Sequence, residues 1–442
     1  MLNLSYRTIL SVAIPLMGST FIQSIVLLTD SSFLSRYDTL AFDAAGNGGL
    51  IYITMFMTLV GLNEGTQILM ARRIGENRES LLPRIFGSSI IINFFIAAIL
   101  FLFSWFILPD IISSNARNME LGQMQVDYVQ IRSYGIIPST ISLAILAYFT
   151  STGKTFMILI NSLIIAFANI GMDYTLIFGH FGFSEMGLDG AAIASTISDY
   201  IGLIFLVIAI YLQPTARKHE MLSKFRVKWS TIKKLFILSS PIMLQGLAAL
   251  LTWTVFFFWI EQMGVFELTV SQNIRSLYFL AFVPIWGFGA TTKTYVSHYI
   301  GRKDFKSVAI ATRRIQLLTV IFLFVIFHGA LFYPEKLIAL VNPEQEFIAT
   351  SAETLRFLFG SMMLYGFCSV YFYTISGSGN TRYILIIELI SVLAYIVCAY
   401  LFIKVLKWDI YSVWSVEYIY FGVIGILSIS YLKFFNWKKK QI

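Results

Sequence analysis

The chain has 442 residues, of which 57% are hydrophobic and only 13% are charged, and its mean hydropathy is +0.76. Soluble domains carry about 25% charged residues, so this composition excludes a protein whose only solvent is water. Two cysteines, both within apolar runs, are too few for a disulfide framework or a cysteine-rich metal site. The composition indicates an integral membrane protein.

Twelve apolar runs are long enough to cross a bilayer core of about 30 Å as helices. They cover residues 9–34, 46–70, 85–109, 124–150, 156–179, 187–212, 232–261, 268–293, 308–333, 350–376, 383–404 and 412–435. Their hydrophobicity is continuous rather than alternating, which excludes the strands of a membrane barrel. The first run lacks a small-residue cleavage site, so we expect it to be retained as a helix.

The basic residues predict how these helices are oriented. Sorted by the alternating loops, 24 of the 32 Lys and Arg residues lie on the side that holds both termini. Cytoplasmic loops carry the excess of Lys and Arg, so both termini are expected in the cytoplasm of a plasma (inner) membrane protein. The net charge of +8 is then explained by topology and lipid headgroups, and no nucleic-acid partner is expected.

Landmark residues recur at an offset of 226 and predict an internal duplication. The pairs are Pro15 and Pro241, Gly61 and Gly287, Gly75 and Gly301, and Gly153 and Gly379. A six-helix unit is even, so its second copy has the same orientation as the first. We therefore expect an all-α membrane fold of two pseudo-symmetric six-helix bundles: an N-lobe at 1–212, a cytoplasmic linker at 213–231 and a C-lobe at 232–442.

No motif of an enzyme appears in a credible context. The segment from Thr150 to Thr155 ends like a Walker A sequence, but Tyr148 stands where that motif needs its first glycine. There are four histidines, and His328 is isolated in its helix, so neither a metal centre nor a hydrolytic set is predicted. We expect no enzyme activity and no cofactor.

Carboxylates inside the predicted spans are the strongest functional signal, because each costs roughly 2.5 to 3.5 kcal/mol at the bilayer centre. Asp30 and Asp173 lie near the outer ends of helices 1 and 5, and Asn169 lies one turn before Asp173. Helix 6 runs inward and carries further polar groups at this depth, namely Ser195, Thr196 and Asp199. Together these six residues predict a site for a proton or a Na⁺ ion.

Two further acids, Glu64 and Glu388, lie nearer the cytoplasmic side, where pairing with loop arginines is at least as well supported as ion binding.

The second half has Phe256 and Ala399 at the positions equivalent to Asp30 and Asp173, so the ion site is expected to be asymmetric. That half is instead rich in aromatic residues, which can hold flat cationic compounds by stacking and by cation–π contact. They predict a substrate cavity lined by Tyr278, Phe282, Trp286, Tyr365 and Tyr371.

Four prolines inside predicted spans are candidate hinges, because each removes a helical hydrogen bond. They are Pro15, Pro138, Pro241 and Pro284. A static kink that only serves packing is the alternative for each.

Several segments resemble the multidrug and toxic compound extrusion (MATE) family. They are RSYGIIP, TGKT, NIGMDY and GLDGAAIASTIS between Ile131 and Ser198, GLNEGTQILMARRIGE from Gly61 to Glu76, SQNI from Ser271, and YVSHYIG from Tyr295. The resemblance covers essentially the whole chain. It implies two lobes that alternate access and export drugs and organic cations in exchange for H⁺ or Na⁺.

Within this family, Asp30 resembles the acid of helix 1, and Asn169 with Asp173 resembles the pair of helix 5. NorM-type members are also expected to have acids in helices 7 and 10, but Ala249 stands at about the helix 7 position and helix 10 has none from Phe357 to Ser376. The resemblance is therefore closer to the DinF-type branch.

The resulting prediction is a monomeric secondary antiporter for small organic cations or amphiphiles, embedded among membrane lipids. The alternative is a flippase for lipid-linked oligosaccharide or polysaccharide, which should line its cavity with Arg and Lys. Only Arg275 and Lys293 are marginally placed for that role.

Overall fold

The computed structural model describes residues 2–115, 119–440 and 442. Contacts divide the chain into two compact units. The first unit is Ile14–Met243, and the second unit is Met1–Ala13 together with Leu244–Ile442. Both divisions fall inside long helices, two residues away from Pro15 in one case and from Pro241 in the other. The predicted lobe and linker boundaries at 212 and 232 stay a prediction.

Every regular element of the described residues is a helix, because continuous apolar runs at membrane depth must satisfy their backbone groups internally. The helices that carry residues of the first unit are α1 (Tyr6–Tyr37), α2 (Thr39–Gly75), α3 (Leu82–Phe106), α4 (Leu108–Asn115), α5 (Met119–Ser133), α6 (Ile136–Thr152), α7 (Phe156–Phe178), α8 (Gly187–Leu212) and α9 (Pro214–Lys218).

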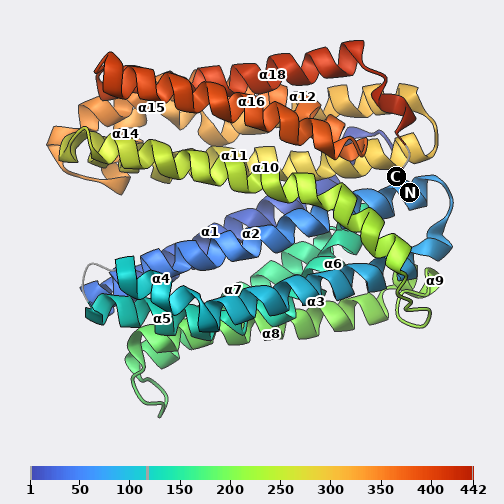
Figure 1. Cartoon of the computed structure of the whole chain (residues 1–442), viewed down its shortest axis with the longest axis horizontal. Helices are drawn as coiled ribbons and strands as arrows, with labels where there is room; N and C mark the ends of the chain where they lie inside the picture. The colour runs from blue at the N-terminus through green and yellow to red at the C-terminus, as the bar shows by residue number, and fades with distance from the viewer. Residues whose placement is uncertain (1, 116–118, 441) are drawn as a thin grey trace. The chain divides into compact units, whose positions relative to one another are not determined.

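Helix α10 (Trp229–Glu261) connects the two units. The second unit continues with α11 (Val265–Gly301), α12 (Phe305–Phe327), α13 (Gly329–Phe332), α14 (Pro334–Val341), α15 (Gln345–Gly377), α16 (Thr381–Tyr400) with a π-helical extension Leu401–Val405, α17 (Ile410–Val413) and α18 (Val416–Phe434). Both chain ends lie at the same end of this unit (Figure 1). Asn3 there accepts a hydrogen bond from Tyr295, and Asn380 donates to the carbonyl oxygen of Trp437.

Among the described residues, eleven helices are long and apolar enough to span a membrane, and there are twelve spans if the bent pair α5–α6 counts as one. The predicted all-helical membrane fold is confirmed. Eleven of the predicted runs coincide with single spans, in which short elements such as α17 are included. The fourth run, 124–150, is instead broken at Tyr134–Gly135, where its two parts bend by 47°.

The predicted duplication is visible in the backbone. Gly75 and Gly301 each end a helix, and the residues two positions later, Asn77 and Lys303, both adopt the left-handed conformation, with φ of 58° and 59°. Non-glycine residues seldom adopt this conformation, so its recurrence at an offset of 226 supports a common origin of the halves. Gly153 and Gly379 repeat a second left-handed position, with φ of 73° and 84°.

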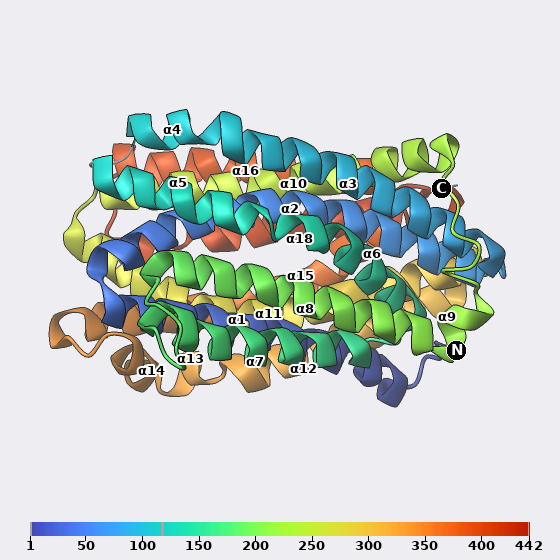
Figure 2. The same cartoon turned by 90° about the horizontal axis from the view of Figure 1, so that it is seen from below.

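Figure 2 shows the bundle from below, with α7 and α8 side by side along the first unit. This pair packs extensively and carries five of the six residues of the predicted ion site. The position of α1 beside α7 completes that site.

Candidate functional site

The first unit brings Asp30 and Asp173 together because α1 and α7 run in parallel. The hydroxyl groups of Ser19 and Ser162 are 2.5 Å apart, and the rings of Phe33 and Tyr174 are 6.5 Å apart. The nearly constant offset between these partners places Asp30 opposite Asp173. Gly18 allows the close approach, because a Cβ atom there would lie 2.9 Å from Leu159.

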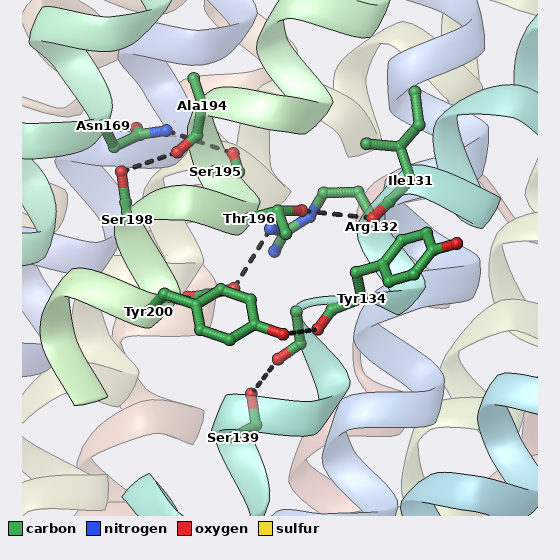
Figure 3. A network of polar contacts seen from close by, with 12 residues as sticks. Ile131, Arg132, Tyr134, Ser139, Asn169, Ala194, Ser195, Thr196, Ser198 and Tyr200 are labelled. Atoms are coloured by element: carbon green, nitrogen blue, oxygen red, sulfur yellow. Dashed lines mark hydrogen bonds and ion pairs between the residues drawn. The ribbon is translucent and has the colours of Figure 1, made fainter. Parts of the chain in front are cut away.

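The two carboxyl groups therefore lie beside each other, between α1 and α7. Asp173 is fully buried, and Asp30 is half-buried. Asn169 is also buried, and its Nδ2 donates to the Ser195 hydroxyl of α8 at 3.2 Å (Figure 3). Four of the six predicted site residues therefore meet, from three different helices.

Four oxygen atoms of this cluster have no hydrogen-bond donor among the described residues. They are Oδ1 of Asp30, both carboxylate oxygens of Asp173 and Oδ1 of Asn169. Buried polar groups in proteins are nearly always satisfied, so an orphaned set indicates a missing partner. Oxygen ligands suit a hard cation, and a proton between two carboxyl groups would also satisfy them. The donor set fits H⁺ or Na⁺.

Thr196 and Asp199 lie on the same helix as Ser195 but contact a different feature, the break between α5 and α6. The Thr196 hydroxyl donates to the carbonyl oxygen of Ile131 at 3.3 Å, and that of Tyr200 donates to Tyr134 at 3.4 Å (Figure 3). Asp199 forms an ion pair with Arg132 at 3.2 Å. Each of the two carbonyl oxygens, of Ile131 and of Tyr134, also accepts a backbone N–H from the residue three positions later, so this face of α8 adds a second donor to each carbonyl at the break.

Arg132 is a residue that the sequence analysis missed. It is the second-last residue of α5, two residues before the break, and its guanidinium group lies 4.1 Å from the centre of the Tyr52 ring. Gly135 makes room for its ion-pair partner, because a Cβ atom there would lie 2.8 Å from Oδ2 of Asp199. The signal was available: Arg132 is a cation inside the predicted fourth span.

The predicted aromatic cavity is only partly assembled. Phe282 contacts three of the other predicted residues, with ring centroids at 5.4 Å from Tyr278, 5.4 Å from Trp286 and 6.0 Å from Tyr365. Tyr371 instead donates to Gln316 and lines a separate hollow of about 360 Å³ beside Phe305 and Lys438. Tyr278 is fully buried and forms part of the core.

The candidate hinges lie inside helices as predicted, Pro15 in α1, Pro241 in α10 and Pro284 in α11. Pro138 is the third residue of α6, just beyond the break. A role of these prolines in motion stays a prediction.

Two buried carboxylates of the second unit differ from expectation. Glu388 contacts no loop arginine: it accepts a hydrogen bond from Gln245 at 3.1 Å and another from Tyr420. That interpretation was wrong because α16 turns Glu388 into the bundle, where it is 1% exposed. Glu417, in the first turn of α18, is 2% exposed and was missed, although it lies inside the predicted twelfth span.

Comparisons with known proteins agree with this architecture. A solved structure described as the outward-facing conformation of a multidrug resistance MATE family transporter of the MOP superfamily superposes with a TM-score of 0.88. It shares 18% sequence identity, over 98% of this chain and 96% of the other.

Two curated bacterial proteins are similar in sequence. The probable multidrug resistance protein NorM of Thermotoga maritima is 24% identical over 92% of this chain and 88% of its own length. The probable multidrug resistance protein YoeA of Bacillus subtilis is 23% identical over 99% and 95%.

The family match itself is duplicated. The MatE family matches residues 15–175 and again residues 241–401, which repeats the offset of 226 and covers well over half of the chain. The chain therefore belongs to the MatE family, a family of membrane transporters and not of enzymes.

Proposed function

We propose that this protein is a secondary antiporter that exports organic cations or amphiphilic drugs in exchange for H⁺ or Na⁺. The observation that carries the proposal is the set of four buried oxygen atoms of Asp30, Asp173 and Asn169 that no protein donor satisfies. Two curated relatives are described as probable multidrug resistance proteins, which supports the class of solute.

The cluster suits an ion that binds and leaves. The Nδ2 group of Asn169 is held by Ser195, so its oxygen atom stays free for a cation beside the two carboxylates. A Na⁺ ion would take lone pairs from all three side chains, whereas a proton would bind one carboxyl oxygen and donate to the other. In both cases the bound ion removes the repulsion between Asp30 and Asp173.

Coupling requires that the ion and the drug favour different access states or exclude each other. Binding at Asp30 and Asp173 ties α1 to α7, and α1 is one of the two helices within which the compact units divide, beside Pro15. The ion site therefore acts on a helix shared between the units. Pro15, Pro138, Pro241 and Pro284 are the proposed hinges for this motion.

The orientation and location are part of the proposal. The excess of Lys and Arg on one side supports cytoplasmic termini, in a monomer of the plasma or inner membrane. The aromatic residues Phe282, Trp286 and Tyr365 are proposed to contact the drug. The absence of acids at the helix 7 and helix 10 positions supports a DinF-type member, although the two curated relatives above carry the names NorM and YoeA.

No structural observation favours the flippase alternative. Its two candidate cations lie against aromatic rings of the second unit, Arg275 at 4.9 Å from the centre of Phe257 and Lys293 at 5.2 Å from that of Tyr373. A pyrophosphate would have to displace these contacts.

The proposal is tested by transport in proteoliposomes. Efflux of a panel of organic cations is measured under a proton gradient and, separately, under a sodium gradient. We expect one of these gradients to drive efflux by the wild-type protein, and Asp30→Asn and Asp173→Asn to abolish it, because each variant removes an ionisable oxygen pair from the site.

The matched control is Asp110→Asn, at an exposed position in α4 of the same unit. It should transport at the wild-type rate. Undiminished ion-driven efflux by both site variants would contradict the proposed ion site. Movement of a lipid-linked sugar without any ion gradient would favour a flippase instead.

A further inference from the structure

The second unit holds a carboxylate, Glu417, in a cage of neutral donors. Its Oε1 accepts hydrogen bonds from Nε1 of Trp253 at 3.3 Å and from the Tyr395 hydroxyl at 3.0 Å, and its Oε2 accepts one from the Tyr278 hydroxyl at 3.0 Å. The donors come from α10, α11 and α16, three helices that surround the first turn of α18. No Lys, Arg or His of the described residues lies within ion-pair distance of Glu417.

This cage satisfies Glu417 in two protonation states. As a carboxylate, it accepts all three hydrogen bonds, which offsets part of the cost of burying a negative charge. As a carboxylic acid, Oε2 can donate its hydrogen to the Tyr278 oxygen, because a hydroxyl group both donates and accepts. The Trp253 and Tyr395 donors stay on Oε1 in both states.

The same cage disfavours a metal cation. The Trp253 N–H group is a donor only, so it presents a positive dipole end to any ion placed against Oε1. In the first unit, four oxygen atoms of Asp30, Asp173 and Asn169 have no donor among the described residues. The two sites therefore differ in kind: one can take H⁺ or Na⁺, and the other can take only H⁺.

A second carboxylate, Glu388, is held in a related way. It accepts from Gln245 at 3.1 Å and from the Tyr420 hydroxyl, and again no basic residue of the described ranges lies within ion-pair distance. The rings of Tyr420 and Tyr395 are in edge-to-face contact, with centroids 5.5 Å apart. One tyrosine from each carboxylate cage therefore packs against the other.

The geometry of the helices spaces the two carboxylates along the unit. Glu388 and Tyr395 are seven residues apart on α16, about 10 Å along its axis. On α18, Glu417 and Tyr420 are three residues apart, about 4.5 Å along the axis. Glu388 contacts the later residue of α18, Tyr420, and Tyr395 contacts the earlier one, Glu417, because α16 and α18 are antiparallel. Glu388, Tyr420, Tyr395 and Glu417 thus form a continuous row between two depths of the membrane.

We propose that Glu417 and Glu388 form a second binding site of this protein, selective for protons, inside the second unit. The site takes up a proton on either carboxyl oxygen and releases it again as a hydronium ion, with no other bond formed or broken. Its part in the transport cycle rests on the proposed antiport, but its binding of protons is an equilibrium property that needs no transport.

The experiment is infrared difference spectroscopy of the purified full-length protein during a pH titration, with and without Na⁺. A protonated carboxyl group absorbs in a region where carboxylates do not. We expect Glu417→Gln to remove one titrating band from the wild-type spectrum and Glu388→Gln to remove another. Neither band should respond to Na⁺. Glu346→Gln, an exposed position in α15, should leave both bands unchanged.

Tyr278→Phe keeps the aromatic ring and tests the same assignment of the Glu417 band if Glu417→Gln does not fold. Loss of its hydroxyl removes one hydrogen bond from Oε2, so the Glu417 band should move in frequency and persist. The proposal is overturned if wild type and Glu417→Gln give the same carboxyl spectra at every pH, or if Tyr278→Phe leaves the band in place. A band displaced by Na⁺ would contradict proton selectivity. Each result is independent of whether Asp30→Asn and Asp173→Asn abolish transport.

Discussion

The two halves of the chain share backbone positions but use them for different chemistry. Tyr52 and Tyr278 are equivalent at the offset of 226: the first stacks on Arg132, whereas the second donates a hydrogen bond to Glu417. The contact between Ser19 and Ser162 in the first half corresponds to that between Gln245 and Glu388 in the second. The duplication preserved which positions touch, and the side chains at those positions diverged.

The largest difference concerns the fourth span of each half. In the first half it is broken at Tyr134–Gly135 into α5 and α6, and α8 supplies hydroxyl donors and an acid to the break. In the second half, the equivalent α15 continues without a break for 33 residues. Leu364 stands there at the position equivalent to Pro138. The fourth span is therefore broken in the first half and unbroken in the second.

Leu364→Pro is the substitution expected to have the largest effect, because it introduces the proline of the first half into the unbroken α15. A proline inside a helix costs about 3 kcal/mol or more, since it removes a hydrogen bond and clashes with the preceding turn. The free energy of unfolding, measured by denaturant titration of the purified protein, should fall by at least that amount.

Pro138→Ala is the reverse change at the equivalent position, and it should alter the free energy of unfolding by less than about 1 kcal/mol, since the break is held by side-chain contacts. Equal effects of the two substitutions would mean that the break and the straight helix do not differ in the way described.

Arg132→Ala tests the ion pair at the break. Both side chains of this pair are partly exposed, so removal of Arg132 leaves the Asp199 charge partly buried and uncompensated, which should cost about 1 to 3 kcal/mol. The double variant Arg132→Ala/Asp199→Asn removes both charges and should recover much of that loss. A single variant no less stable than the double one would show that the pair has no role at the break.

The sequence was sufficient to predict the spans and the duplication, and also the cluster of Asp30, Asn169 and Asp173, because the alternating direction of the spans puts these polar residues at one depth. It did not predict that Thr196 and Asp199 turn toward the α5–α6 break. Residues only one and four positions beyond Ser195 point to different neighbours, and their contacts depend on how α5 bends. Arg132 and Glu417 are also charges inside predicted spans, but their partners lie on other helices, so the pattern along their own helix does not identify them.

Thr196→Val should have a smaller effect, confined to the first half. The substitution keeps the shape of the side chain and removes one of the two donors to the Ile131 carbonyl oxygen, the other being the backbone N–H of Tyr134. The expected loss is about 1 kcal/mol in the free energy of unfolding. The equivalent position, Gly422, has no side chain to make such a contact, so Gly422→Ala serves as the matched control. If Thr196→Val leaves the free energy of unfolding unchanged, the Thr196 hydroxyl does not stabilise the break.

His219 predicts a pH dependence that only the first half can show. It follows α9 and contacts Tyr148 at 3.0 Å and Glu79 at 3.2 Å, whereas the equivalent of Tyr148 is Thr374. Burial lowers the pKa of His219 below its ordinary value of about 6.5. When the linker segment 213–231 detaches from Tyr148 and Glu79, its His219 regains the ordinary pKa and binds more protons than in the docked linker. Docking of the linker therefore weakens as the pH falls from about 6.5 toward the lowered pKa.

Limited trypsin cleavage at Lys218 and Lys224, normalised to an exposed reference peptide, measures this docking. Cleavage of the wild-type linker should become faster as the pH falls through that window. His219→Phe has no titrating ring and should lose the pH dependence, whereas an unchanged pH profile in this variant would assign the effect to another group.

The most direct test of the central claim is the release of the coupling ion when drug binds. An organic cation is added to the purified protein in weakly buffered solution, while liberated H⁺ and displaced radioactive Na⁺ are both counted. We predict that the wild-type protein releases one of these ions and that the Asp30→Asn/Asp173→Asn double variant releases neither. Release of the same amount by the double variant would contradict the assignment of the ion site to Asp30, Asn169 and Asp173.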